Sequence, residues 1–463
     1  KAARDPLEAS RNDDPLTAAP AVVWHWNRHK NESMPVVYDQ TGAALAKATR
    51  LARDLYMIDP RRGDWQRLYL TAMLQAAQVR RGLGEPLSTG PDSAYSVAAF
   101  YDADVLDDLL AHAILDGYLP AAIATAQILG DIGHAKLLVR GGVEPSPLAL
   151  AANHADQRLR FAGIQAIMKL APAQPYPGSS RVADGLGFFA SSYGVPRVLV
   201  AHPNSAQAQT MAGLATTLGY ETDIATNGRD AFELAVRSPD YDFALIHAAI
   251  ERPAIDHLVA QFRRDPRTAR LPIGLIALPD DLERLERFAQ RTPEAMAFMQ
   301  PQDEAQMKVR ASQLLDQAGR WHLSAAERKA QAESALDWLA VEAARPELVY
   351  DVYRQEPAVA SALYIPELSA RASAVLASLG TATSQRSLLE LADLAAQPLA
   401  LREAAATALA RSIGQFGLRL SRDEILQQYE LYNSNAGRNG DTHTVLSAVL
   451  DAIELNNTPT GGQ

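Results

Sequence analysis

Five short apolar runs that alternate with amphipathic helical segments, between residues 195 and 301, constrain the fold of this chain more than any other feature. The runs are residues 198–201, 222–225, 243–247, 273–278 and 295–299. Such alternation is typical of βαβ units built on a parallel sheet. Each run is apolar at successive positions, which suits strands that helices cover on both faces. We therefore expect a five-stranded parallel sheet between two layers of helices.

The segments of this block follow one another in a recognisable order. Arg197-Val-Leu-Val-Ala201 precedes a helical segment and then Leu218-Gly-Tyr-Glu-Thr-Asp-Ile-Ala-Thr-Asn-Gly-Arg-Asp-Ala231. Asp240-Tyr-Asp-Phe-Ala-Leu-Ile-His247, Leu271-Pro-Ile-Gly-Leu-Ile-Ala277 and Phe298-Met-Gln-Pro301 come next. In this order the block resembles the receiver domain of response regulators. The resemblance implies a flavodoxin-like α/β domain over residues 195–318.

Receiver domains collect acidic side chains at the carboxyl ends of their strands, where these hold Mg²⁺ and present one aspartate to a phosphoryl donor. The resemblance places His202 and Pro203 at the acidic pair and His247 at the phosphoacceptor. It places Ala277 at the hydroxyl residue and Gln300 at the lysine that pairs with the phosphoryl group. With no carboxylate and no ammonium at these positions, the resemblance implies a degenerate pseudo-receiver that does not transfer phosphoryl groups.

His202 and His247 are the candidate site residues of this domain, because the resemblance sets them side by side at the carboxyl ends of adjacent strands. Two interpretations are open. With Asn204 or Glu251 nearby, the two imidazoles are candidate ligands for a transition metal. Alternatively, both rings fill the emptied acidic pocket and form hydrogen bonds with loop backbone. We expect no catalytic residues, no cofactor and no resident metal.

Helical segments occupy the chain on both sides of this block. Residues 120–133, 156–170 and 399–411 have alanine-rich faces with leucine or isoleucine at spacings of three and four. Such faces allow neighbouring helices to stack closely. The segments resemble the inner helices of HEAT repeats, as in bacterial HEAT-repeat proteins. We therefore expect a mixed fold in which HEAT-like, α-solenoid segments flank the α/β domain.

The expected domain organisation has six parts. These are an arm or linker (1–21), an N-terminal hairpin and helical-repeat domain (22–171), a linker (172–194), the receiver-like α/β domain (195–318), a C-terminal helical-repeat domain (319–455) and a disordered tail (456–463).

Two strand-like segments, residues 22–26 and 34–38, predict a small hairpin at the start of the N-terminal domain. Its aromatic and basic side chains form a conceivable stacking platform for single-stranded nucleic acid; they are Trp24, Trp26, Arg28, His29 and Lys30. We favour packing of one aromatic face on the helices that follow. His25 and His29 are four residues apart, a spacing that brings two metal ligands together on a helix but not on a strand.

Composition narrows the classes of partner. The formal net charge of -10 argues against nucleic acid as a ligand, since that affinity rests on basic patches that neutralise phosphates. The chain contains no cysteine, which removes thiolate metal sites and cysteine nucleophiles. No apolar run approaches the roughly 18 residues of a spanning helix, so we expect no membrane insertion. Because the first residue is Lys1 rather than Met, we expect a processed or partial chain, and both the bacterial cytoplasm and the periplasm are open as its location.

These observations favour a non-catalytic protein–protein interaction scaffold or structural subunit of a larger bacterial assembly. The alternative is a phosphorylation-independent signalling or ligand-sensing protein. The sequence contains no nucleophile elbow, P-loop or zinc signature that would indicate an enzyme. The expected partners are other protein subunits, with self-association included, and the expected contact regions are residues 22–82 and 429–453.

Overall fold

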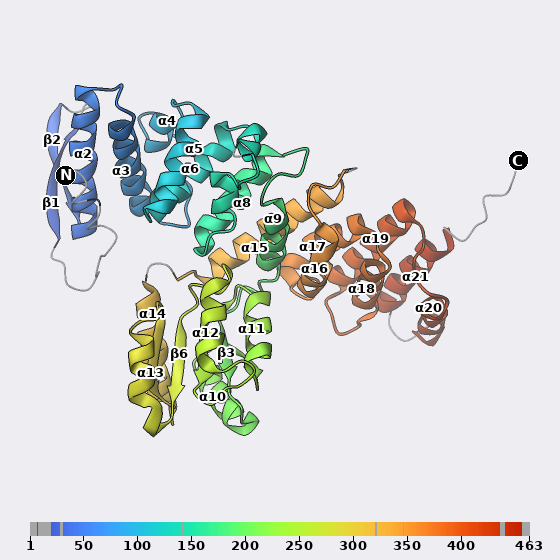
Figure 1. Cartoon of the computed structure of the whole chain (residues 1–463). Helices are drawn as coiled ribbons and strands as arrows, with labels where there is room; N and C mark the ends of the chain where they lie inside the picture. The colour runs from blue at the N-terminus through green and yellow to red at the C-terminus, as the bar shows by residue number, and fades with distance from the viewer. Residues whose placement is uncertain are drawn as a thin grey trace, which may run out of the picture. The chain divides into compact units, whose positions relative to one another are not determined.

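A computed structural model describes residues 20–27, 31–140, 142–319, 322–345, 347–435 and 440–455, together with Leu7 (Figure 1). The chain divides into two compact units, Lys1–Val182 and Ala183–Gln463. Most of the predicted arm (1–21) and the whole predicted tail (456–463) lie outside the described residues.

The first unit consists of a two-stranded hairpin and a set of packed helices. Its elements are β1 (Ala21–Asn27), β2 (Glu32–Tyr38), α2 (Gln40–Ile58), α3 (Gly63–Arg81), α4 (Ala94–Ala98), α5 (Ala103–Leu115), α6 (Leu119–Ile132), η1 (Ala135–Val139), α7 (Pro147–Ala151) and α8 (Gln157–Leu170). Helices α3, α6 and α8 pack successively, with α2 on α3 and α5 on α6. The alanine-rich face of α6 is buried from Leu119 to Thr125, which permits the close approach of its neighbours.

The predicted hairpin is confirmed, because β1 and β2 pair antiparallel with Val22 opposite Val37. The prediction that its aromatic face packs on the helices is wrong. Trp24 and Trp26 are 65% and 60% exposed. Alternate residues of a strand share one face, and no described helix covers the face that carries both tryptophans. Arg28, His29 and Lys30 lie outside the described residues.

Helix α9 (Ser179–Ala190) occupies much of the segment that the sequence indicated as a linker, residues 172–194. Val182, Leu186 and Phe189 are fully buried. Their spacing of four and three puts them on one face of a helix. The proline and glycine residues on both sides obscured this pattern, and the segment is a packed helix rather than a plain connection.

The centre of the second unit is a five-stranded parallel sheet, as predicted. Its strands are β3 (Arg197–Ala201), β4 (Glu221–Ala225), β5 (Tyr241–His247), β6 (Ile273–Ala277) and β7 (Ala295–Met299). The strand order is β4-β3-β5-β6-β7, and every neighbouring pair is parallel. All seven residues of β5 are buried, as expected for a central strand with helices on both faces.

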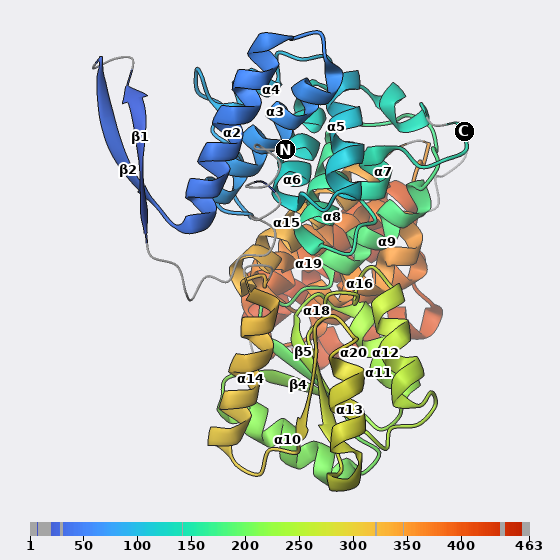
Figure 2. The same cartoon turned by 60° about the vertical axis from the view of Figure 1, so that its left-hand side comes forward.

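Helices cover both faces of the sheet (Figure 2). They are α10 (Ser205–Thr217), α11 (Gly228–Arg237), α12 (Ile255–Arg264), η2 (Pro279–Asp281), α13 (Leu282–Ala289) and α14 (Glu304–Ala318). Val198 and Val200 of β3 pack with residues of α10 and α14. Leu199 and Ala201 of the same strand pack with residues of α11, α12 and α13. The alternation of side chains along one strand therefore separates two apolar cores.

The rest of the second unit is helical. Its elements are α15 (Ala325–Ala343), η4 (Val352–Gln355), α16 (Glu356–Ala362), α17 (Pro366–Leu379), α18 (Ala382–Asp393), α19 (Leu399–Phe416), α20 (Arg422–Asn435) and α21 (Gly440–Leu455). Helices α15, α17, α19 and α21 pack one on the next, with α16, α18 and α20 beside them. The mixed fold of helices and a parallel sheet agrees with the sequence analysis. In the described part of the chain, no helix combines the length and apolarity needed to cross a bilayer.

A buried cluster of charges joins the sheet to α15. Asp240 and Asp242, at the start of β5, are 0% and 5% exposed, and Arg328 of α15 is 3% exposed. Arg328 Nη1 donates to Asp242 Oδ1 at 2.8 Å, and its Nε lies 3.5 Å from Asp240 Oδ1. Ser192 Oγ and the Tyr193 N–H donate to the two oxygens of Asp240 at 2.6 and 2.5 Å. His322 Nε2 also lies 3.1 Å from Asp242 Oδ1. The carboxylates are therefore held by one guanidinium, one imidazole, the Ser192 hydroxyl and the Tyr193 N–H.

We expect Arg328→Met to lower the free energy of unfolding by about 3 to 5 kcal/mol, because it removes the guanidinium that pairs with two buried carboxylates. Urea unfolding followed by circular dichroism measures this change. Lys329→Met is the matched control on the same helix. Lys329 forms an exposed ion pair with Glu367 at 3.1 Å, so its loss should cost less than about 1 kcal/mol. Equal effects of the two substitutions would contradict the importance of the buried cluster.

Candidate functional site

The five positions singled out in the sequence lie at or just beyond the carboxyl ends of the strands. His202 and Pro203 follow β3, and His247 ends β5. Ala277 ends β6, and Gln300 follows β7. Because the strands are parallel, their carboxyl ends meet at one edge of the sheet, where open α/β sheets bind ligands.

His202 and His247 are in contact, as expected from the adjacency of β3 and β5. Their ring centroids are 4.1 Å apart and the rings are tilted by 44°. The two residues are 5% and 7% exposed. The other three positions differ in character: Ala277 is buried in the apolar core, Pro203 is exposed, and Gln300 Nε2 donates to Gln207 Oε1 at 2.9 Å.

A backbone N–H of the following loop donates a hydrogen bond to the Nδ1 atom of each histidine. His202 Nδ1 accepts the Asn204 N–H at 2.9 Å, and His247 Nδ1 accepts the Ala249 N–H at 3.1 Å. A nitrogen that accepts carries no proton, so the neutral ring holds its hydrogen on Nε2. These contacts support the interpretation that the rings fill an emptied acidic pocket.

Burial favours the neutral form of both imidazoles. It lowers the pKa of His202 below its ordinary value. Burial, with the neighbouring His202 ring, lowers the pKa of His247 to about 4. Both imidazoles are therefore uncharged at neutral pH.

The geometry does not assemble a metal site from the candidates considered. The Nδ1 atoms already accept from backbone, and the Nε2 atoms carry hydrogens. Asn204 Oδ1 accepts the N–H groups of Ala206 and Gln207 and so caps α10. Glu251 is exposed. Across the described ranges, no cluster of three or more His, Cys, Asp or Glu side chains is arranged to hold an ion. His25 and His29 cannot be tested, since the His25 side chain and His29 lie outside the described part.

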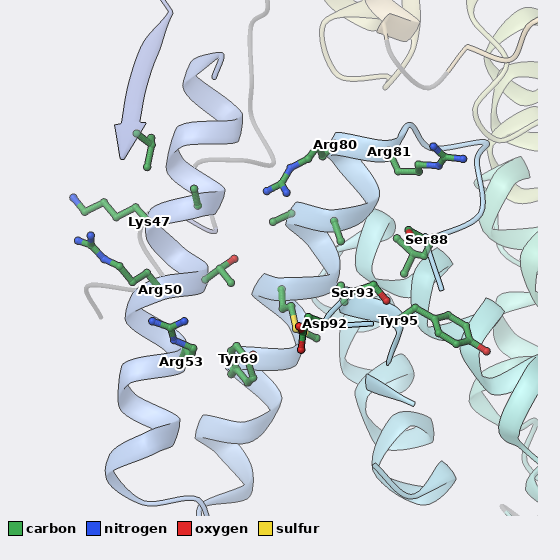
Figure 3. Close-up of a pocket in the computed structure, with 18 of the residues that line it drawn as sticks. Lys47, Arg50, Arg53, Tyr69, Arg80, Arg81, Ser88, Asp92, Ser93 and Tyr95 are labelled. Carbon is green, nitrogen blue, oxygen red and sulfur yellow. The ribbon is translucent and has the colours of Figure 1, made fainter. Parts of the chain in front are cut away.

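A second candidate site, a basic groove, lies in the first unit and was not found from the sequence. It has a volume of about 1270 Å³. The basic groove is lined by residues from β1, α2, α3 and the segment around α4. Its charged lining residues are Lys47, Arg50, Arg53, Arg80, Arg81 and Asp92 (Figure 3). Its aromatic surface comes from Trp24, Trp26, Tyr69 and Tyr95. Among the residues that the structure describes, five cations and one carboxylate line the basic groove, so this lining has a net positive charge.

The cations of the basic groove come from two helices. Lys47, Arg50 and Arg53 recur every three residues along α2 and so share one side of that helix. Figure 3 shows Lys47 and Arg50 extending from α2 on the side away from α3, and Arg80 extending from α3 toward α2. All of these side chains are exposed. The spacing of three between Lys47, Arg50 and Arg53 is the sequence signal that could have indicated this basic side of α2.

A third candidate site is a hollow of about 660 Å³ near the amino ends of β3 and β5 within the second unit. It is bounded by α9, η4 and α16. Four arginines line it, namely Arg197, Arg237, Arg267 and Arg354. Arg197 is neutralised by Glu221 and Asp223, each at 3.3 Å, and Arg267 by Asp265 at 2.8 Å. Much of its positive charge is therefore already paired.

Comparison of the sequence with protein-family models found no matching family, and comparison with curated proteins found no matching relative. The functional argument therefore rests on the residues themselves.

We expect His247→Asn to remove part of the acid sensitivity of the fold. The pKa of His247 is about 4 in the folded chain, whereas an unfolded histidine has a pKa of about 6.5. Over that interval the unfolded state binds the extra proton, so stability falls as the pH falls. Asparagine offers an oxygen near the position of Nδ1 to the Ala249 N–H and does not titrate.

The measurement is the free energy of unfolding in urea at about pH 7 and about pH 4. Wild type should lose about 1 to 3 kcal/mol more than His247→Asn over this range. His257→Asn, at an exposed histidine of the same α/β domain, is the control and should behave as wild type. A His247→Asn variant with wild-type acid sensitivity would refute the assignment.

Proposed function

We propose that this chain is a non-catalytic protein–protein interaction scaffold, or a structural subunit of a larger bacterial assembly, built around a receiver-like domain that cannot be phosphorylated. The observation that carries the proposal is the carboxyl edge of the sheet. There His202 and His247 form a buried, neutral pair where a receiver would gather its carboxylates. Because such a domain does not transfer phosphoryl groups, its contribution is the binding of other proteins through its surface.

The topology supports the receiver-like part of the proposal. When the strands are numbered in chain order, their order across the sheet is second, first, third, fourth and fifth. This is the flavodoxin-like order. In a receiver, Mg²⁺ needs hard oxygen ligands at this edge. Ala277 and Gln300 supply neither a hydroxyl for the phosphoryl group nor an ammonium to pair with it.

The helical segments support the scaffold part. In the C-terminal array, α15, α17, α19 and α21 pack one on the next, as HEAT-like repeats do when each unit buries its apolar face on a neighbour. Arrays of this kind expose long surfaces that bind other proteins. Their terminal units, here residues 22–82 and 429–453, are the expected contact regions. Leu426 and Leu455, which flank the second region on α20 and α21, are 50% and 76% exposed.

A second candidate function is phosphorylation-independent ligand sensing. The observation that favours it is the hollow of about 660 Å³ between the amino ends of the strands and η4–α16. A small anion bound there would touch the α/β domain and the helices after it, and would bias their packing. A small molecule retained by the purified chain in fixed ratio, with no protein partner, would favour sensing over the scaffold.

We expect acetyl phosphate with Mg²⁺ to leave the chain unmodified, because no carboxylate stands at the phosphoacceptor position, His247. Intact-mass measurement checks this, with an active receiver domain treated in parallel as the positive control. An added phosphoryl mass that maps to residues 195–301 would overturn the pseudo-receiver assignment.

We expect the purified chain to associate at micromolar concentration, and deletion of residues 1–38 to reduce this association because it removes the exposed face of the hairpin. Light scattering gives the mass. Deletion of residues 456–463 is the control and should leave the mass unchanged. A monodisperse monomer, unaffected by the loss of residues 1–38, would rule out an assembly role for that end.

A further inference from the structure

The hairpin presents an aromatic surface that the fold itself does not use. Trp24 and Trp26 lie two residues apart on β1, so their side chains share one face of the strand. They are 65% and 60% exposed. Both line the basic groove defined above. Two exposed tryptophan rings on a two-stranded hairpin form a candidate contact surface, because apolar area of this size is usually buried.

The cations beside these rings are available for an external anion. Within the described residues, Lys47 and Arg50 form no ion pair. Arg80 lies over the Tyr38 ring at 5.6 Å, which leaves its guanidinium without a carboxylate partner there. In the same described part of the chain, the ion pairs of Arg53 and Arg81 are long and exposed, with Asp54 at 3.8 Å and Glu85 at 4.0 Å. Such pairs contribute little and exchange easily. Arg81 Nε also donates to Pro86 O at 3.2 Å.

The net charge of the chain does not describe the basic groove. Residues 1–182 contain 19 Lys or Arg and 19 Asp or Glu, so the charge of -10 arises entirely from residues 183–463. Within residues 40–81, which form α2 and α3, eight residues are basic and three are acidic. The argument against nucleic acid from net charge therefore does not apply to this surface.

We propose that the basic groove binds single-stranded nucleic acid, with bases stacked on Trp24 and Trp26 and phosphates paired with Lys47, Arg50 and Arg80. A positive groove with aromatic platforms is the chemistry by which proteins hold unpaired strands without reading their sequence. An acidic protein segment would use the cations and leave the flat ring faces unoccupied. The inference goes beyond the scaffold proposal, which treats residues 22–82 only as a region of contact with protein, and it does not depend on the receiver-like domain.

The test uses the full chain and fluorescein-labelled oligonucleotides of about 12 nucleotides, one of deoxythymidine and one of uridine. Fluorescence anisotropy at about 50 mM and about 200 mM salt gives affinity and salt dependence. Quenching of tryptophan fluorescence reports stacking. We expect binding at the lower salt, and comparison of the two oligonucleotides distinguishes DNA from RNA as the preferred ligand.

Two double variants separate the two contributions. Lys47→Gln with Arg50→Gln should weaken binding about 5- to 20-fold and flatten the salt dependence, because two phosphate contacts are lost. Trp24→Ala with Trp26→Ala should weaken binding at least about 10-fold and remove the quenching, with the salt dependence unchanged. All four residues are exposed, so the fold tolerates both variants, and circular dichroism verifies this.

Exposed residues of the first unit outside the groove lining supply matched controls. Arg61→Gln with Lys136→Gln removes the same charge, and Phe100→Ala removes a ring that is 90% exposed; neither should alter binding. No binding at about 50 mM salt, or equal losses in the controls, would overturn the proposal. So would binding of polyglutamate at the same affinity with no effect of the tryptophan variant, since that result assigns the groove to an acidic protein.

Discussion

The buried contact of Arg328 with Asp240 and Asp242 determines how the second unit holds together. Removing an ion from water costs several kcal/mol, so each of these side chains is stable in the interior only while the others are present. Asp242 belongs to β5, the central strand of the sheet, Asp240 directly precedes that strand, and the arginine belongs to α15. Because α15 begins the row that continues through α17, α19 and α21, this cluster attaches the first helix of the row to the amino end of β5.

Much of the fold was predictable, because local pattern and final burial agree. All five strands of the sheet lie at the apolar runs, and the helices between them follow the expected periodicity. Helix α9 was missed because prolines and glycines surround the segment that contains Phe189. The exposure of Trp24 and Trp26 was also missed. Alternation along a strand indicates which residues share a face, but a sequence does not reveal what covers that face.

The first two candidate sites differed in how far they could be foreseen. The contact of His202 with His247 followed from the adjacency of two parallel strands, yet their protonation depends on N–H groups of Asn204 and Ala249, whose direction only the backbone defines. The basic groove combines two helices and a hairpin. Its cations were hidden in a net charge averaged over the chain, and no single segment contains the site.

The two ends of the sheet differ in the kind of side chain that closes them. At the carboxyl ends, His202 and His247 are uncharged and capped by backbone; at the amino ends, Arg197, Asp240 and Asp242 are each held by a counter-ion. Another uncharged acceptor can replace a histidine at the cost of packing, whereas loss of one paired charge leaves its buried partner without a counter-ion. During divergence of related sequences, purifying selection should act most strictly on the amino ends, the reverse of the pattern imposed by phosphotransfer.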